Sequence, residues 1–79
     1  MTLLIEGTHE LDVKGLQCPM PIVKTAKAMK ELASGEVIRV FATDPGSVKD
    51  FAAWSKATGN QLLESRASDG VFLFVLRKR

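Results

Sequence analysis

The sequence contains a single cysteine, Cys18, and this scarcity excludes several kinds of site. An internal disulfide needs two thiols, and cysteine-based zinc or iron–sulfur sites need several thiolates in one chain. A thioredoxin-like reaction would also need a second cysteine to resolve the mixed disulfide. We therefore expect no metal, no organic cofactor and a reducing compartment.

Long apolar runs and a strong net charge are also missing. The first apolar run, residues 3–5, is far shorter than the about 18 residues of a membrane span or the about 7 of a signal-peptide core. We expect a soluble, cytoplasmic protein that does not insert into membranes. The formal net charge of +2 is too small to indicate direct nucleic-acid binding, which uses clustered Lys and Arg.

What the sequence does contain is enough for one small globular domain. Of its 79 residues, 46 % are hydrophobic and 25 % are charged, so it can build a single core and is not biased towards disorder. We expect one domain over residues 1–79, with a loosely ordered or extended N-terminal segment over residues 1–8.

Four strands and two helices are predicted in the order βαβαββ from alternating and helical hydrophobic patterns. The strands are expected at residues 9–13, 36–42, 61–67 and 71–77. Asp69-Gly70, between the last two, is typical of a hairpin turn. These elements predict an α+β fold: a two-layer sandwich in which a four-stranded mixed sheet carries both helices on one face and leaves the other largely open.

The two expected helices have similar beginnings, each with a proline. Pro19 is expected at the first position of the first helix, which should run to Ser34-Gly35. For the second helix, we expect Asp44 to cap the free N–H groups and Pro45 to take the first position. Gly59 is expected to end it.

Cys18 lies in a glycine-containing loop at the start of the first expected helix, outside the apolar stripe of that helix. A lone cysteine in a small domain is usually a buried hydrophobe, but a helix start in a loop is normally at the surface. The partial positive charge of a helix N-terminus favours thiolate over thiol. We therefore expect a modest lowering of the pKa of Cys18, limited because prolines replace two N–H donors of the first turn.

The chain offers no base for a hydrolase of the Cys-His type. Its single histidine, His9, begins the first expected strand and Cys18 follows the other end of that strand, so we expect His9 to face solvent. An exposed nucleophile without a base or a second thiol suits a carrier that receives a group from one protein and passes it to another. Sulfur transfer is the matching chemistry, because thiolates attack sulfur electrophiles, and the product would be a persulfide on Cys18.

Eleven residues around the cysteine resemble the signature of the TusA/SirA family of sulfur carrier proteins. The pattern L-D-x-x-G-L-x-C-P-x-P is present over residues 11–21. Beside Cys18, the residues expected to support this motif are Asp12, Gly15, Pro19 and Pro21. Residues 44–47 (DPGS) and the Asp69-Gly70 hairpin with its basic end, residues 77–79, extend the resemblance from about residue 9 onwards.

The resemblance implies a βαβαββ sandwich and a persulfide on Cys18. It also implies sulfur transfer from a cysteine desulfurase, a rhodanese-like protein or a thiosulfate-derived donor to an acceptor protein, in tRNA thiolation, molybdenum cofactor synthesis or sulfur oxidation. Some relatives carry a further cysteine where this chain has Ser55, so no second-thiol chemistry is expected. We expect transient protein partners, a monomer, and a carrier rather than a self-contained turnover enzyme.

Candidate docking residues surround the motif. Lys14, Lys24 and Lys27 are expected to place positive charge around the thiol and to dock an acidic partner surface, the alternative being an ordinary solvated face. Met20, between the prolines, is a further candidate contact, and Asp44 is a candidate for docking as well as for capping.

A rival hypothesis assigns the function to the open face of the sheet. In that case the protein is a regulatory or interaction module that binds protein or RNA, with Phe41 and Arg39 on the binding face and an incidental thiol. The fold cannot decide between the two hypotheses, because function resides in sites rather than in folds. Trp54 is expected to be part-buried, and Asp12 is expected to shape the loop before Gly15.

Overall fold

A computed structural model describes residues 8–79 of the chain and contains all six expected elements. They are β1 (Thr8–Asp12), α1 (Met20–Met29), β2 (Val37–Ala42), α2 (Ser47–Thr58), β3 (Gln61–Ser68) and β4 (Val71–Arg77). The expected loose segment lies outside the described residues except for Thr8, which belongs to β1. Neither helix of residues 8–79 is long and apolar enough to cross a membrane.

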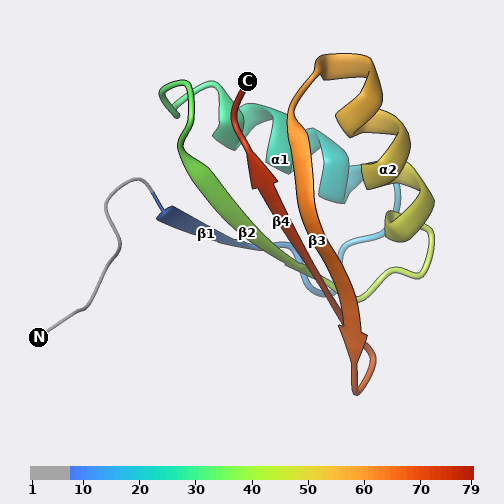
Figure 1. Cartoon of the computed structure of the whole chain (residues 1–79). Helices are drawn as coiled ribbons and strands as arrows, with labels where there is room; N and C mark the ends of the chain where they lie inside the picture. The colour runs from blue at the N-terminus through green and yellow to red at the C-terminus, as the bar shows by residue number, and fades with distance from the viewer. Residues whose placement is uncertain (1–7) are drawn as a thin grey trace, which may run out of the picture.

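The four strands form one mixed sheet in the order β1-β2-β4-β3. β1 pairs in parallel with β2, whereas β4 is antiparallel to both β2 and β3 and lies between them. Both helices cover the same face of this sheet (Figure 1). The predicted α+β two-layer sandwich, with two helices on one face of a four-stranded mixed sheet, is therefore confirmed.

The core lies between the helices and the two central strands. Alternate residues of β2 are buried, as the period of two along a strand requires, and Val40 pairs across the sheet with the buried Phe74 of β4. From α2, the fully buried Phe51 stacks on Phe74 with ring centroids 4.4 Å apart and an interplanar angle of 19°. This contact fixes α2 against the sheet, and with it the residues of its first turn.

The boundaries of α1 differ from the prediction. Pro19 occupies the N-cap position, the helix begins at Met20, and Pro21 lies buried in the first turn. The regular helix ends at Met29 instead of running to Ser34-Gly35, because the amides after it bond to carbonyls three residues back. Leu32 still reaches the core through this tighter winding.

The predicted start of α2 is wrong in register. The helix begins at Ser47 with Gly46 at the N-cap position, and no side chain caps it. Asp44 lies too early in the chain for that role: its carboxylate accepts a long hydrogen bond from the Gly46 amide, 3.4 Å, and a shorter one from another loop. The expected end is confirmed, since Gly59 has φ +81° and its N–H donates to the Ser55 carbonyl at 2.9 Å.

Candidate functional site

Two loops meet at one edge of the sheet and form the site. Because β1 and β2 run parallel, their carboxyl ends lie at the same edge, so the loop before α1 is next to the loop before α2. The N–H of Gly15 in the first loop donates to Thr43 Oγ1 in the second, 2.9 Å away. Gly15 has φ +83°, a conformation that glycine adopts without steric cost.

The residues before the cysteine hold the first loop in a tight turn. Asp12 Oδ1 accepts a hydrogen bond from the Lys14 N–H at 2.9 Å, and the N–H of Leu16 donates to the Val13 carbonyl at 3.2 Å. Asp12 therefore shapes the loop before Gly15, as the sequence predicted. The turn brings the following residues to the surface beside α2.

Cys18 is a free, exposed cysteine, and its backbone N–H and its thiol each donate a hydrogen bond to a carboxylate. Its backbone N–H donates to Asp44 Oδ2 at 2.8 Å, and its Sγ–H donates to Asp50 Oδ2 at 2.7 Å. Asp44 lies in the loop before α2, and Asp50 lies in the first turn of α2. Cys18 is therefore not the buried hydrophobe that a lone cysteine usually is.

The carboxylates change the expected electrostatics of the thiol. The pKa of Cys18 is raised above its ordinary value, first because Asp50 accepts its hydrogen bond, then through desolvation and the negative charges of Asp50 and Asp44. The predicted lowering is therefore wrong. The amide of Met20, at the start of α1, bonds to the Gln17 carbonyl instead of to the sulfur.

The lysines predicted around the thiol are on the surface but do not determine its charge environment. Lys14, Lys24 and Lys27 are exposed, and Lys14 Nζ lies 4.0 Å from Asp12 Oδ2. In residues 8–79, the charged groups that act on the pKa of Cys18 are both acidic. Docking by the lysines and by the exposed Met20 stays a prediction.

Other candidate residues are placed away from the sulfur. His9 is exposed as predicted, and its Nε2 lies 3.5 Å from Glu36 Oε1, so its described partner is a carboxylate and not Cys18. Ser55 donates its hydroxyl hydrogen bond within its own helix, to the Ala52 carbonyl at 2.9 Å. Trp54 is part-buried as expected, edge-on to Phe51 with ring centroids 6.3 Å apart.

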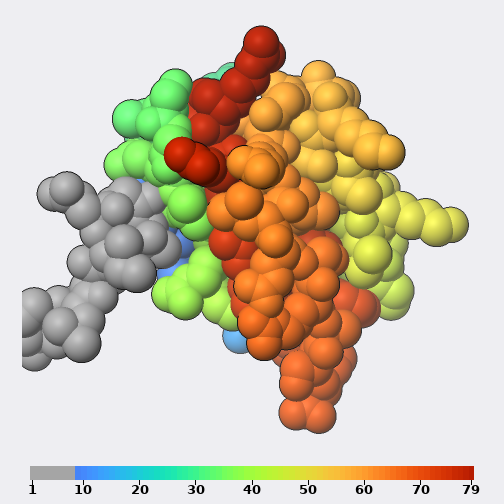
Figure 2. All heavy atoms as spheres, in the orientation of Figure 1, coloured from blue at the N-terminus to red at the C-terminus, as the bar shows by residue number. Residues whose placement is uncertain are grey.

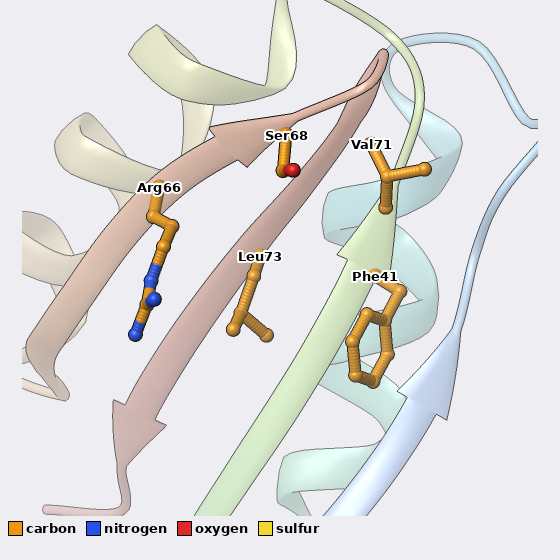
Figure 3. A pocket seen from close by; sticks show the side chains of 5 residues that line it. All are labelled: Phe41, Arg66, Ser68, Val71 and Leu73. Atoms are coloured by element: carbon orange, nitrogen blue, oxygen red, sulfur yellow. The ribbon is translucent and has the colours of Figure 1, made fainter.

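The open face of the sheet carries a shallow hollow of about 300 Å³. Phe41, Arg66, Ser68, Val71 and Leu73, from β2, β3 and β4, line it, and their side chains lie on the same side of the sheet (Figure 3). In the space-filling view, β4 is set back between β2 and β3 on this face (Figure 2).

The second residue named for the open face is engaged within the sheet. Arg39 forms an ion pair with Glu10 of the neighbouring β1, and the two residues are partners in the β1–β2 register. Arg66, on the rim of the hollow, is paired with Glu64 on its own strand. Both of these arginines are therefore paired with neighbouring carboxylates.

Two residues of the site were missed by the sequence reasoning. Asp50 binds the thiol, and Thr43 anchors the loop at Gly15. A signal for both was present, because residues just after β2 and in the first turn of α2 must lie beside the loop that follows the parallel strand β1. The residues from Asp44 onwards also match a local helix-cap pattern, which carries no information about this long-range relation.

The chain is similar to known sulfur carrier proteins. The family described as sulfurtransferase TusA matches residues 9–78. The chain is 52 % identical over 70 residues to the sulfur carrier protein TusA of Allochromatium vinosum, covering 89 % of this chain and 92 % of that one. It is 49 % identical over 75 residues to the putative sulfur carrier protein YrkF of Bacillus subtilis, covering 95 % of this chain and 40 % of that one.

A solved structure is also similar. The crystal structure of a SirA-like protein from Desulfitobacterium hafniense superposes with a TM-score of 0.78 at 27 % identity, over 87 % of this chain and 95 % of the other. The family match spans both loops of the site and all but the first residue of β1. The chain therefore belongs to the TusA family of sulfur carrier proteins.

Proposed function

We propose that the protein carries sulfane sulfur as a persulfide on Cys18 and relays it from a donor protein to an acceptor protein. The observation that supports this proposal is the position of Cys18. It is an exposed free thiol in the loop before α1, and hydrogen bonds to the loop before α2 hold this loop at the edge of the sheet. An exposed sulfur on an anchored loop can be reached by the cysteines of two different proteins in turn.

The loading step conserves atoms and electrons. The Cys18 thiolate attacks the terminal sulfur of a donor persulfide, a new S–S bond forms, and the donor's own S–S bond breaks. The donor cysteine leaves as a thiolate with the electron pair, and the proton first held by Cys18 passes to solvent. With thiosulfate as donor, the leaving group is sulfite.

Unloading is the same exchange with the roles changed. A thiolate of the acceptor attacks the outer sulfur of the Cys18 persulfide, and Cys18 leaves as a thiolate that takes a proton from solvent. No cofactor or external reductant is needed for this transfer. The protein completes no reaction alone, because both the source and the destination of the sulfur are other molecules.

Intact mass spectrometry tests the proposal. The purified, reduced protein is incubated with polysulfide, with thiosulfate, or with a cysteine desulfurase and cysteine. We expect a gain of one sulfur that dithiothreitol removes. Cys18→Ser is the matched control, and a variant that gains sulfur as well as the wild type, or a wild type that gains none from any donor, would refute the proposal.

The hollow on the open face is a second candidate surface for function. Its side chains Phe41, Val71 and Leu73 supply an apolar floor, and Ser68 and Arg66 supply polar groups at its side. If this face alone carried the function, Phe41→Ser would abolish partner binding and Cys18→Ser would not. The carrier proposal expects the reverse.

A further inference from the structure

The Cys18 sulfur is hydrogen-bonded to a carboxylate, which is an unfavourable partner for a nucleophile. Asp50 Oδ2 lies 2.7 Å from Sγ, and a carboxylate can only accept the hydrogen that the thiol supplies. If the thiol lost its proton, two negative atoms would face each other at this distance. The contact therefore stabilises the unreactive form of the sulfur.

A second carboxylate acts in the same direction. Asp44 Oδ2 accepts the N–H of Cys18 at 2.8 Å, so this backbone donor is occupied by an acidic side chain and is not offered to a thiolate. Both aspartates belong to the chain segment that follows β2, and both approach Cys18 from the same neighbouring loop and helix start. The arrangement thus depends on the packing of α2 beside the cysteine loop.

The basic groups near the site do not offset these charges. The thiol faces Asp50 from α2 and Asp44 from the loop before α2, and Lys14 of its own loop is paired with a carboxylate there. On α1, Lys24 and Lys27 are exposed and form no ion pair with another residue of 8–79. Among residues 8–79 no cation forms an ion pair with Asp50, so its carboxylate is open to a cation of another molecule.

We propose that Asp50 restrains Cys18 as an unreactive thiol in the free protein, and that a cationic side chain of the sulfur-transfer partner releases it by pairing with the Asp50 carboxylate. This inference rests on the proposed carrier function and adds a way in which the reactivity of Cys18 is regulated. When the cation pairs with Asp50, Sγ–H loses its acceptor, its proton passes to solvent, and the thiolate attacks the partner's sulfur. The partner is thus defined chemically as a protein that carries a Lys or Arg next to its own reactive sulfur.

Alkylation with iodoacetamide, followed by intact mass across a pH series, tests the restraint. Asp50→Asn keeps a hydrogen-bonding side chain but removes its charge, so we expect the rate profile to move to lower pH. At neutral pH the rate should rise at least about twofold, because it follows the thiolate fraction. Asp69→Asn, the same chemical change in the β3–β4 turn, is the matched control and should overlay the wild type, because Asp69 neither bonds to Cys18 nor acts on its pKa.

Charged reagents test the preference for a cationic partner. Two methanethiosulfonates are used, one that carries a trimethylammonium group and one that carries a sulfonate group. Both react with the thiolate, so the thiolate fraction cancels in the ratio of their rates, and the ratio reports the electrostatic field at the sulfur. The ratio of the rate with the cationic reagent to the rate with the anionic reagent is divided by the same ratio for 2-mercaptoethanol. For the wild type we expect a value above one, which falls as added salt screens the charges. For Asp50→Asn we expect a lower value than for the wild type.

The outcomes separate this inference from the carrier function. A folded Asp50→Asn protein, checked by circular dichroism, whose pH profile overlays the wild type would overturn the restraint. A wild-type ratio at or below that of 2-mercaptoethanol would overturn the cationic partner, and this measurement needs no variant, so it tests that part of the proposal even if Asp50→Asn does not fold. Sulfur loading is read separately, by the mass gain, so either idea can fail without the other.

Discussion

Replacement of Gly15 by alanine perturbs the backbone of the cysteine loop and nothing else. Gly15 has φ +83°, and a Cβ built on it meets no atom within 4 Å. The substitution therefore adds no clash, and its whole cost is that of placing an L-residue in the left-handed region. That cost is about 1–2 kcal/mol of the free energy of unfolding.

The neighbouring loop supplies a matched control. Gly46 has φ −65° and ψ −18°, which alanine adopts readily, and the nearest atom to its added Cβ would be Asp44 Oδ2 at 3.4 Å. Gly46→Ala should be neutral or stabilise by about 0.4–1 kcal/mol, because it reduces the entropy of the unfolded chain. Gly15→Asn should fall between the two, since asparagine tolerates the left-handed conformation better than alanine.

Urea unfolding followed by the fluorescence of Trp54, the only tryptophan, measures these differences. For a domain of this size, each kcal/mol should also lower the melting temperature by about 4–8 °C. The midpoints should order as Gly46→Ala highest, then Gly15→Asn, then Gly15→Ala, with unchanged slopes. Equal midpoints for the two alanine variants would refute the assignment of the cost to the φ angle of Gly15.

Three further predictions concern the core, the acid response and docking. Phe51→Ala should lose about 3–5 kcal/mol of a total of about 4–12 kcal/mol, because it removes a fully buried ring stacked on another, and a loss below about 1 kcal/mol in urea unfolding would contradict the packing. The pKa of Glu36 is lowered, first by its hydrogen bond from the Ala33 amide, so this group stabilises the fold above its ordinary pKa of 4.5 and the contribution is lost as pH falls through the folded value. Glu36→Gln should therefore flatten the decline of melting temperature with acid, and an unchanged decline would count against this role. Charge reversal of the three lysines predicted to dock a partner should slow sulfur transfer to or from a protein without changing melting temperature, and unchanged transfer rates would exclude the docking role.

The fold was predictable because its signals are local. Alternating residues in β2, the Asp69-Gly70 hairpin, and the glycine after α2 each determine the structure of their own segment, and the order βαβαββ then leaves few arrangements. The helix starts were predicted less well. A proline is accepted at several positions around a helix start, so Pro19 and Pro45 do not fix the first helical residue.

The reactive residue of the site could be predicted from the sequence, but the groups that surround it could not. The position of Cys18 in a glycine turn before a helix correctly predicted exposure. Its partners Asp44 and Asp50 are 26 and 32 residues away in sequence, and they reach it only through the parallel pairing of β1 with β2 and the packing of α2. The helix field, a local signal, favoured the wrong direction of the pKa shift because a long-range hydrogen bond dominates it.

The central position of β4 affects the order in which the chain can fold during its synthesis. β4 is the last of the described strands, yet β3 pairs only with it in the sheet and α2 packs against both. On a translating ribosome, residues 8–70 emerge first and have no strand to join β2 to β3. Until β4 follows, α2 lacks much of its support, so we expect the hydrogen bond from Cys18 Sγ to Asp50 to form only after the last strand has joined the sheet.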